Sequence, residues 1–407
     1  MVRIVEGGIT APAGFQAAGV ACGIKKHRDP ARPAPLDLAL VVADRLVPAA
    51  GVFTTNKAVA PPVVVSREHL QATGGWARAI VTNSGCANAA TGEAGRQVAR
   101  QMAAAAAAAV GCADREVLVA STGVIGVLLD IEKVRAGITA AAAALSATGG
   151  DNATRAIMTT DPFPKSYAAA YDSPEGTIIV GGMTKGSGMI EPRMATMLGY
   201  LTTDAQIEPG VLADALKYVV DLTFNAITVD GECSTNDSVF VMASGASGVA
   251  ITDSRDPRLI TPLMHVARYL AREIVRGGEG ATKLVTVKVT GAATSADAWL
   301  AARTIANSPL VKTAIHGGDP NWGRLVAAAG RSGAAFNLDR ASVWVGDVKV
   351  FDEGTPHDER TPLAEAVLQD ADVTVVVDLG LGGPHEATMW TCDFSAEYVK
   401  INAEYRT

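Results

Sequence analysis

Cysteine and aromatic residues are scarce in this sequence. Its 407 residues include five cysteines, and Phe, Trp and Tyr together make up 5% of the chain. The cysteines are Cys22, Cys86, Cys112, Cys233 and Cys392; they form no C-x-x-C pair and have no histidine at zinc-finger spacing. A disulfide framework and a structural metal site are therefore disfavoured, and this cysteine usage is typical of a reducing cytoplasm.

The sequence also lacks an excess of positive charge. Its 35 Lys and Arg residues are outnumbered by 42 Asp and Glu residues, and there is no long basic block. The sequence therefore lacks the positive charge by which proteins usually bind nucleic acids and anionic membranes. The longest stretch of low polarity, residues 102–110, is too short to cross a bilayer, and the first residues do not resemble a secretory signal. We expect a cytoplasmic protein that binds neither nucleic acid nor membranes.

Several common catalytic motifs are missing as well. The glycine-rich run at 181–188 does not lead into G-K-[ST], no G-x-G is followed by a third glycine three positions on, and both H-E-x-x-H and G-x-S-x-G are absent. A phosphate-binding loop, a dinucleotide fingerprint, a zinc protease helix and a serine hydrolase with a nucleophile elbow are therefore disfavoured.

The composition is that of a globular α/β protein. Hydrophobic residues make up 48% of the chain, and short apolar segments alternate with alanine-rich ones, as expected of a layered α/β fold. We predict strands over residues 77–82, 117–120, 285–289, 343–345, 348–351 and 373–378. Helices are expected over 95–110 and 295–306 and from 361, with a loop or boundary over 146–152.

Six loops are dense in Gly, Thr, Asn and Ser, which supply NH and OH donors and let a backbone approach a ligand closely. Any one of them could equally be an ordinary turn, since turns favour the same residues. The loops cover residues 83–88, 121–123, 158–161, 185–198, 230–237 and 316–324.

One of these loops makes the sequence recognisable. Residues 185–198 read KGSGMIEPRMATML, which closely resembles the ornithine acetyltransferase family, the bifunctional glutamate N-acetyltransferases of arginine biosynthesis. The resemblance extends from residues 8–15 (GITAPAGF) to 401–407 (INAEYRT) and so covers nearly the whole chain. It implies an α/β fold of stacked β layers flanked by helices, shared with self-processing enzymes that use an N-terminal threonine.

The resemblance also implies self-cleavage between Ala195 and Thr196. The pieces would be residues 1–195 and 196–407, the second of 212 residues. A threonine hydroxyl needs a base beside it to act as a nucleophile. Cleavage would place that base on the same residue, because a new α-amino group has a pKa of about 7.7–8.0 and is partly neutral near working pH.

Further site residues follow from the resemblance, position by position. Thr122 and Gly123 are expected to form an oxyanion hole, through a hydroxyl and a backbone NH. The residues expected to contact substrate are Thr159, Lys185, Thr196, Glu279, Asn402 and Thr407. Lys185 could meet a substrate carboxylate and Glu279 an ammonium group. The motif differs from the sequence usual in the family at Glu191 and Arg193, on either side of Pro192.

The reaction implied is ping-pong transfer of an acetyl group from N2-acetyl-L-ornithine to L-glutamate through acetyl-Thr196. It requires no metal or organic cofactor, and the two pieces are expected to assemble as an α2β2 heterotetramer. Many family members also accept acetyl-CoA as donor, and the sequence leaves that activity open. The alternatives are a self-processing aminopeptidase or amidase of the same fold, and a binding protein that never cuts itself.

Overall fold

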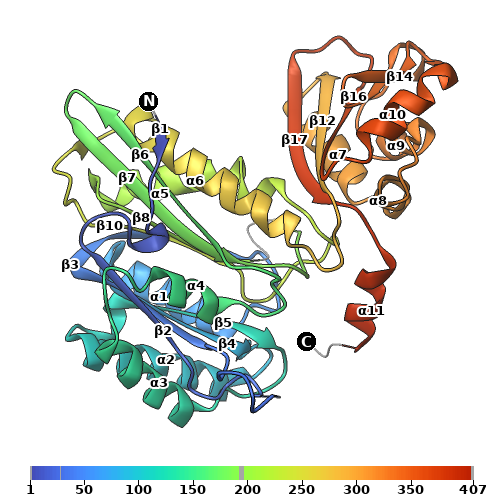
Figure 1. The fold of residues 1–407 in the computed structure, drawn as a ribbon. Helices are drawn as coiled ribbons and strands as arrows, with labels where there is room; N and C mark the ends of the chain where they lie inside the picture. Colours follow the sequence, from blue (N-terminus) through green and yellow to red (C-terminus); the bar gives the residue numbers. More distant parts are fainter. Residues whose placement is uncertain (1, 28, 192–196, 405–407) are drawn as a thin grey trace. The chain divides into compact units, whose positions relative to one another are not determined.

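The computed structural model describes residues 2–27, 29–191 and 197–404, which fall into two compact units (Figure 1). Among the described residues, the first unit comprises 2–225 and 232–274, and the second comprises 226–231 and 275–404. Within the described residues no helix is both long and apolar enough to cross a membrane.

The first unit is built on a nine-stranded sheet. Its strands are β1 (Val2–Ile4), β2 (Phe15–Val20), β3 (Leu38–Phe53), β4 (Trp76–Cys86), β5 (Val117–Val124), β6 (Lys165–Ser173), β7 (Gly176–Lys185), β8 (Leu198–Thr203) and β10 (Ser238–Ala243). A small two-stranded sheet pairs β9 (Gln206–Ile207) with β11 (Ala250–Ile251). The helices are α1 (Pro61–Thr73), α2 (Gly92–Val110), α3 (Ile131–Ala143), α4 (Gly150–Ile157), α5 (Pro209–Asp221) and α6 (Pro257–Arg276).

The long strand β3 joins the two halves of this sheet. Its first part pairs with β2 and β4, and its last part, from Ala49 to Phe53, pairs with β10. The register with β4 shifts between Val42 and Val47. Such an irregularity bends a strand and increases its twist, which lets the sheet fold into two layers.

Both faces of β3 are buried, because its successive side chains pack alternately into two different hydrophobic cores. Successive side chains of a strand point to opposite faces. Leu38 and Leu40 pack with α2 and α3, whereas Ala39 and Val41 belong to a second core shared with α4, β7, β8 and β10. Figure 1 shows the resulting layers, with α2 and α3 beneath the lower strands and α5 and α6 above the upper ones.

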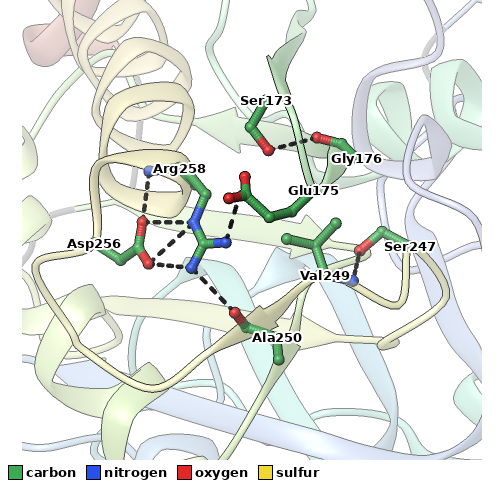
Figure 2. A network of polar contacts seen from close by, with 8 residues as sticks. All are labelled: Ser173, Glu175, Gly176, Ser247, Val249, Ala250, Asp256 and Arg258. Atoms are coloured by element: carbon green, nitrogen blue, oxygen red, sulfur yellow. Dashed lines mark hydrogen bonds and ion pairs between the residues drawn. The ribbon is translucent and has the colours of Figure 1, made fainter.

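The start of α6 is tied to the turn between β6 and β7 by a polar network (Figure 2). Arg258 makes a bidentate ion pair with Asp256, with its shortest contact at 2.6 Å, and lies 3.8 Å from the Glu175 carboxylate. It also donates a hydrogen bond to the Ala250 carbonyl. One guanidinium thus connects α6 to the β6–β7 turn and to β11.

The second unit holds a six-stranded sheet in the order β15-β14-β13-β16-β12-β17. The strands are β12 (Leu284–Ala292), β13 (Ser342–Val345), β14 (Val348–Asp352), β15 (Thr355–Pro356), β16 (Asp372–Asp378) and β17 (His385–Cys392). The helices are α7 (Ser295–Ala306), α8 (Pro309–His316), α9 (Trp322–Gly330), α10 (Thr361–Val367) and α11 (Ala396–Glu404). The inward valines of β12 and β16 pack against alanines of α7.

The fold confirms the predicted α/β layering and most of the predicted elements. The predicted strands 117–120, 285–289, 343–345 and 373–378 lie inside β5, β12, β13 and β16, and the helix predicted over 295–306 is α7. Other predictions were wrong in part. Residues 121–123, predicted as a loop, belong to β5, which continues to Val124. Residues 83–86 continue β4 instead of forming a loop, because their polar side chains find partners inside the protein.

The loop or boundary predicted over residues 146–152 is confirmed as a loop for 146–149, which lie between α3 and α4, but not for 150–152 and not as a boundary. Helix α4 already begins at Gly150, and the first unit continues through the whole segment. Gly149 and Gly150 are needed here for close approach: a Cβ on Gly149 would lie 1.8 Å from the Ala17 carbonyl oxygen. Two glycines that resemble a loop signal therefore let the helix start against β2.

Candidate active site

Thr122 and Gly123 lie near the end of β5, where it runs parallel to β4. Ser84 is paired with Thr122 and Gly85 with Gly123. The Thr122 side chain is buried, and its hydroxyl oxygen accepts a hydrogen bond of 3.1 Å from the Lys185 ammonium. Two residues expected at the site, 63 positions apart in the chain, are thus in direct contact.

Position 123 requires glycine. Its φ is +127°, and a Cβ there would lie 2.4 Å from the Gly85 carbonyl carbon and 2.6 Å from the Cys86 nitrogen. The ladder is irregular at this point, because Cys86 is paired with both Thr122 and Val124. The bulge and the absent side chain turn the backbone at residue 123 away from regular strand geometry, as expected of a backbone that serves a ligand.

Buried amide side chains hold this strand end in place. Asn236 donates to the carbonyl oxygens of Ala87, at 2.6 Å, and Ser121, at 2.9 Å. Asn83 donates to the Cys86 carbonyl and accepts a hydrogen bond of 2.6 Å from the Ser121 hydroxyl. The loops at 83–88, 121–123 and 230–237, which the sequence marked separately, therefore meet at one place.

Asp161 connects two further segments of the site. One of its carboxylate oxygens accepts from the Thr159 backbone NH at 2.9 Å. The other accepts from the Gly186 NH and from the Lys165 ammonium, each at 2.7 Å. The loop after α4 and the end of β7 are thereby joined, which brings the backbone of Thr159 close to that of Lys185 and Gly186.

The Asp161–Lys165 ion pair is completely buried, with neither side chain exposed. Burial by itself would raise the pKa of Asp161. The Lys165 and Lys185 ammonium groups and the Gly186 NH outweigh that effect, so the pKa of Asp161 lies below its ordinary value. The Asp161 carboxylate therefore stays charged at neutral pH.

The recognised motif itself lies in the link between β7 and β8. These strands are antiparallel neighbours, with Lys185 paired to Leu198. The NH of Glu191 donates to the Glu232 carbonyl at 2.7 Å. Arg193, Ala195, Thr196 and Thr407 lie outside the described residues.

The second unit contains two of the other residues expected to bind substrate. Asn402, on α11, donates a hydrogen bond of 2.9 Å to the Glu279 carboxylate and another to the Tyr398 carbonyl. The two residues inferred from the resemblance are thus neighbours, although 123 positions separate them.

A cluster near Glu279 was not predicted from the sequence. His316 and Asp393 are in contact at 2.6 Å through Nδ1 and a carboxylate oxygen. Asp393 also accepts from the Thr282 hydroxyl and from the backbone NH groups of Thr282 and Lys283. Burial raises the pKa of Asp393, but these donors outweigh it and leave the pKa below its ordinary value. His316 lies in the glycine-rich loop at 316–324 that the sequence singled out. Nothing in the sequence connected it with Asp393, 77 positions away.

The Thr122 hydroxyl, the Gly123 backbone and the buried Lys185 ammonium lie together at the ends of β5 and β7. Donors fixed on a rigid sheet in this way are typical of an enzyme of the α/β class. The ArgJ family model matches residues 16–407. The chain belongs to the ArgJ family, which confirms the resemblance seen at residues 185–198.

Individual relatives agree with this family assignment. The chain is 47% identical to the arginine biosynthesis bifunctional protein ArgJ of Symbiobacterium thermophilum, over 99% of both chains. It is also 47% identical to the protein of the same name from Chlorobaculum tepidum, over 97% of this chain and 96% of that one. The solved ArgJ of Bacillus halodurans is 42% identical with a TM-score of 0.50, and that whole chain matches 52% of this one.

Proposed function

We propose that this protein transfers the acetyl group of N2-acetyl-L-ornithine to L-glutamate through an acetyl ester on Thr196. The observation that carries the proposal is the hydrogen bond from Lys185 to Thr122 beside the glycine turn at Gly123. The names of the relatives, which place them in arginine biosynthesis, support the choice of substrates.

The direction of the Lys185–Thr122 hydrogen bond suits an oxyanion hole. An ammonium group can only donate, so the Thr122 oxygen must be the acceptor. The hydroxyl proton is therefore not used in this bond and can be donated to the oxygen of a tetrahedral intermediate. The positive charge on Lys185 also makes that hydroxyl a better donor, and the Gly123 NH would be the second donor.

In the proposed sequence, Thr196 attacks the acetyl carbonyl while its own α-amino group takes the hydroxyl proton. Ornithine leaves with a proton, and the acetyl group remains as an ester. The neutral amine of glutamate then attacks this ester, its proton passes through the α-amino group to the threonine oxygen, and N-acetylglutamate leaves. The steps need no metal or organic cofactor. Acetyl-CoA as an alternative donor would enter at the first step.

Self-cleavage between Ala195 and Thr196 is part of the same proposal. The match to the whole solved Bacillus chain spans 52% of this chain, and a piece of 212 residues out of 407 would have that share. Because β7 and β8 pair with each other, pieces 1–195 and 196–407 would both contribute strands to one sheet. We expect them to stay together and to assemble as an α2β2 heterotetramer in the cytoplasm.

Substrate contacts are assigned to Thr159, Lys185, Thr196, Glu279, Asn402 and Thr407. Lys185 would attract a substrate carboxylate and Glu279 an ammonium group, the two charged groups that amino acids carry. The assignment is supported by the contacts that join Thr159 to Gly186 through Asp161 and Asn402 to Glu279.

The test is an assay with purified protein, N2-acetyl-L-ornithine and L-glutamate. The proposal requires that N-acetylglutamate and ornithine form in equal amounts and that almost no acetate appears. If free acetate is released equally fast with and without glutamate, the protein is a hydrolase instead. Replacing acetylornithine by acetyl-CoA tests the second donor.

A further inference from the structure

A short loop before β3 lies directly over the glycine turn of the site. The carboxylate of Asp37, which is completely buried, accepts hydrogen bonds from the backbone NH groups of Cys22 (2.7 Å), Ile24 (2.7 Å) and Lys25 (3.0 Å). Three NH groups converging on one carboxylate fix the path of the loop and therefore the position of Lys25.

Lys25 is packed against the strand pair that carries Gly123. A Cβ on Gly85 would lie 3.0 Å from Cγ of Lys25 and 3.2 Å from its backbone nitrogen, so Lys25 lies directly against the Gly85 backbone. Gly85 is in turn paired with Gly123. The Lys25 backbone is therefore separated from the proposed oxyanion hole by a single strand.

The Lys25 ammonium adds positive charge to this part of the first unit. It donates a hydrogen bond of 2.7 Å to the Leu36 carbonyl, and it interacts electrostatically with Asp37, Asp161 and Lys185. Asp37 is occupied by the loop's own NH groups, and Asp161 already carries the Lys165 ion pair. The two ammonium groups of Lys25 and Lys185 repel each other, and an anionic ligand would relieve that repulsion.

We infer that Lys25 is a specificity-determining residue, a second cation that acts with Lys185 to favour the dicarboxylate acceptor, L-glutamate. This inference rests on the proposed function. At neutral pH glutamate carries two carboxylates and one ammonium group, whereas N2-acetyl-L-ornithine carries one of each. A further positive charge therefore attracts the acceptor, which has a net negative charge, more strongly than the donor, which has none.

The inference is tested with Lys25→Met, which keeps the length of the side chain and removes its charge. Lys26→Met is the matched control, because Lys26 is the next residue of the same loop and is exposed. Thermal unfolding is measured for both variants, and Lys25→Arg serves as the conservative replacement that restores the charge. Initial rates then give KM for glutamate at saturating donor and KM for acetylornithine at saturating glutamate.

We expect Lys25→Met to raise KM for glutamate roughly tenfold to hundredfold, as for the loss of one charge-assisted hydrogen bond, with little change in KM for the donor. Lys26→Met should change neither value, and Lys25→Arg should recover most of the glutamate affinity. An equal rise in both KM values, or none, would overturn the inference.

Calorimetric binding separates this inference from the proposed reaction. L-Glutamate and its uncharged analogue L-glutamine are titrated into the wild type and into Lys25→Met. A preference for glutamate in the wild type that Lys25→Met abolishes supports the inference even if no acetyl transfer is observed. The same preference in both proteins, or no preference in the wild type, overturns it and leaves the proposed reaction standing on its own assay.

Discussion

The Lys185 ammonium donates a 3.1 Å hydrogen bond to the Thr122 hydroxyl, which joins the end of β7 to the end of β5. The contact orients the hydroxyl so that its proton faces away from the lysine, and it places a positive charge beside a proposed oxyanion hole. The proposed role of Thr122 depends on this contact.

Removal of the Thr122 hydroxyl should slow the reaction without unfolding the protein. We expect Thr122→Val to lower kcat by a factor of roughly 10²–10³, the usual cost of one oxyanion donor, with a much smaller change in KM. Thr122→Ser should keep most of the rate. Thr177→Val is the control, because the Thr177 hydroxyl bonds an exposed aspartate on the β6–β7 hairpin. Equal kcat values for Thr122→Val and the wild type would refute the assignment.

Lys185 and Thr122 should act as a unit. Lys185→Met is expected to raise KM for at least one substrate sharply and also to lower kcat, since the neighbouring hydroxyl loses its orientation. In the double variant with Thr122→Val the losses should not add, and a coupling free energy of about 0.5–3 kcal/mol is expected. Unchanged KM values for both substrates would defeat the assignment of Lys185.

Gly123 can be tested by a pair of glycine variants. Gly123→Ala places a Cβ 2.4 Å from backbone and should destabilise the fold and abolish turnover. Gly126 also has a positive φ, +80°, but a Cβ there would meet nothing within 4 Å. Gly126→Ala should therefore cost only the strain of that backbone conformation, about 1–2 kcal/mol. Denaturant unfolding measures both. If Gly123→Ala is no more destabilised than Gly126→Ala, close backbone approach does not explain the glycine.

The buried Asp161–Lys165 pair should behave as a coupled unit in stability. Asp161→Asn or Lys165→Met alone leaves one uncompensated buried charge and should lower the free energy of unfolding by about 3–5 kcal/mol. The double variant should recover a large part of that loss. Because the pKa of Asp161 is lowered in the folded protein, its stabilising contribution is present at neutral pH and is lost as the pH falls through the folded-state pKa. Two single variants as stable as the wild type would contradict this account.

Lys25 should make glutamate binding sensitive to alkaline pH. Burial, and to a smaller extent the charge of Lys185, lowers the pKa of Lys25 to about 8. The carboxylates of Asp37 and Asp161 act in the opposite direction and raise it. The side chain is charged below this pH and neutral above it, so KM for glutamate should rise as the pH passes 8. The rise should be absent in Lys25→Met and should begin at lower pH in Asp161→Asn. A rise of equal size in Lys25→Met would assign the effect to another group.

The sequence was most informative where structure depends on local pattern. The strand predicted over 285–289 lies inside β12 and the helix predicted over 295–306 is α7, because the side-chain periods of strands and helices are local properties. Two of the predicted polar loops lie partly or wholly in strands, since 83–86 belong to β4 and 121–123 to β5, and nothing local showed which polar segments meet.

The contacts that organise the site could not be predicted because they join distant segments. Asn236 reaches Ala87 across 149 positions, and Asp161 binds Gly186 across 25. Gly150 was assigned to a loop although it begins α4, because the close approach of the preceding Gly149 to Ala17 on β2, more than a hundred residues away, is not visible locally. Only the family resemblance pointed to Thr122 and Lys185 as members of one site.

The most direct test is mass spectrometry of the recombinant protein and of Thr196→Ala, each with and without N2-acetyl-L-ornithine. The account predicts that the wild type is cut into pieces of 195 and 212 residues and that acetylornithine adds one acetyl group to the piece that begins at Thr196. Thr196→Ala should stay intact, carry no acetyl group and transfer none. Cleavage and turnover by Thr196→Ala would contradict the account.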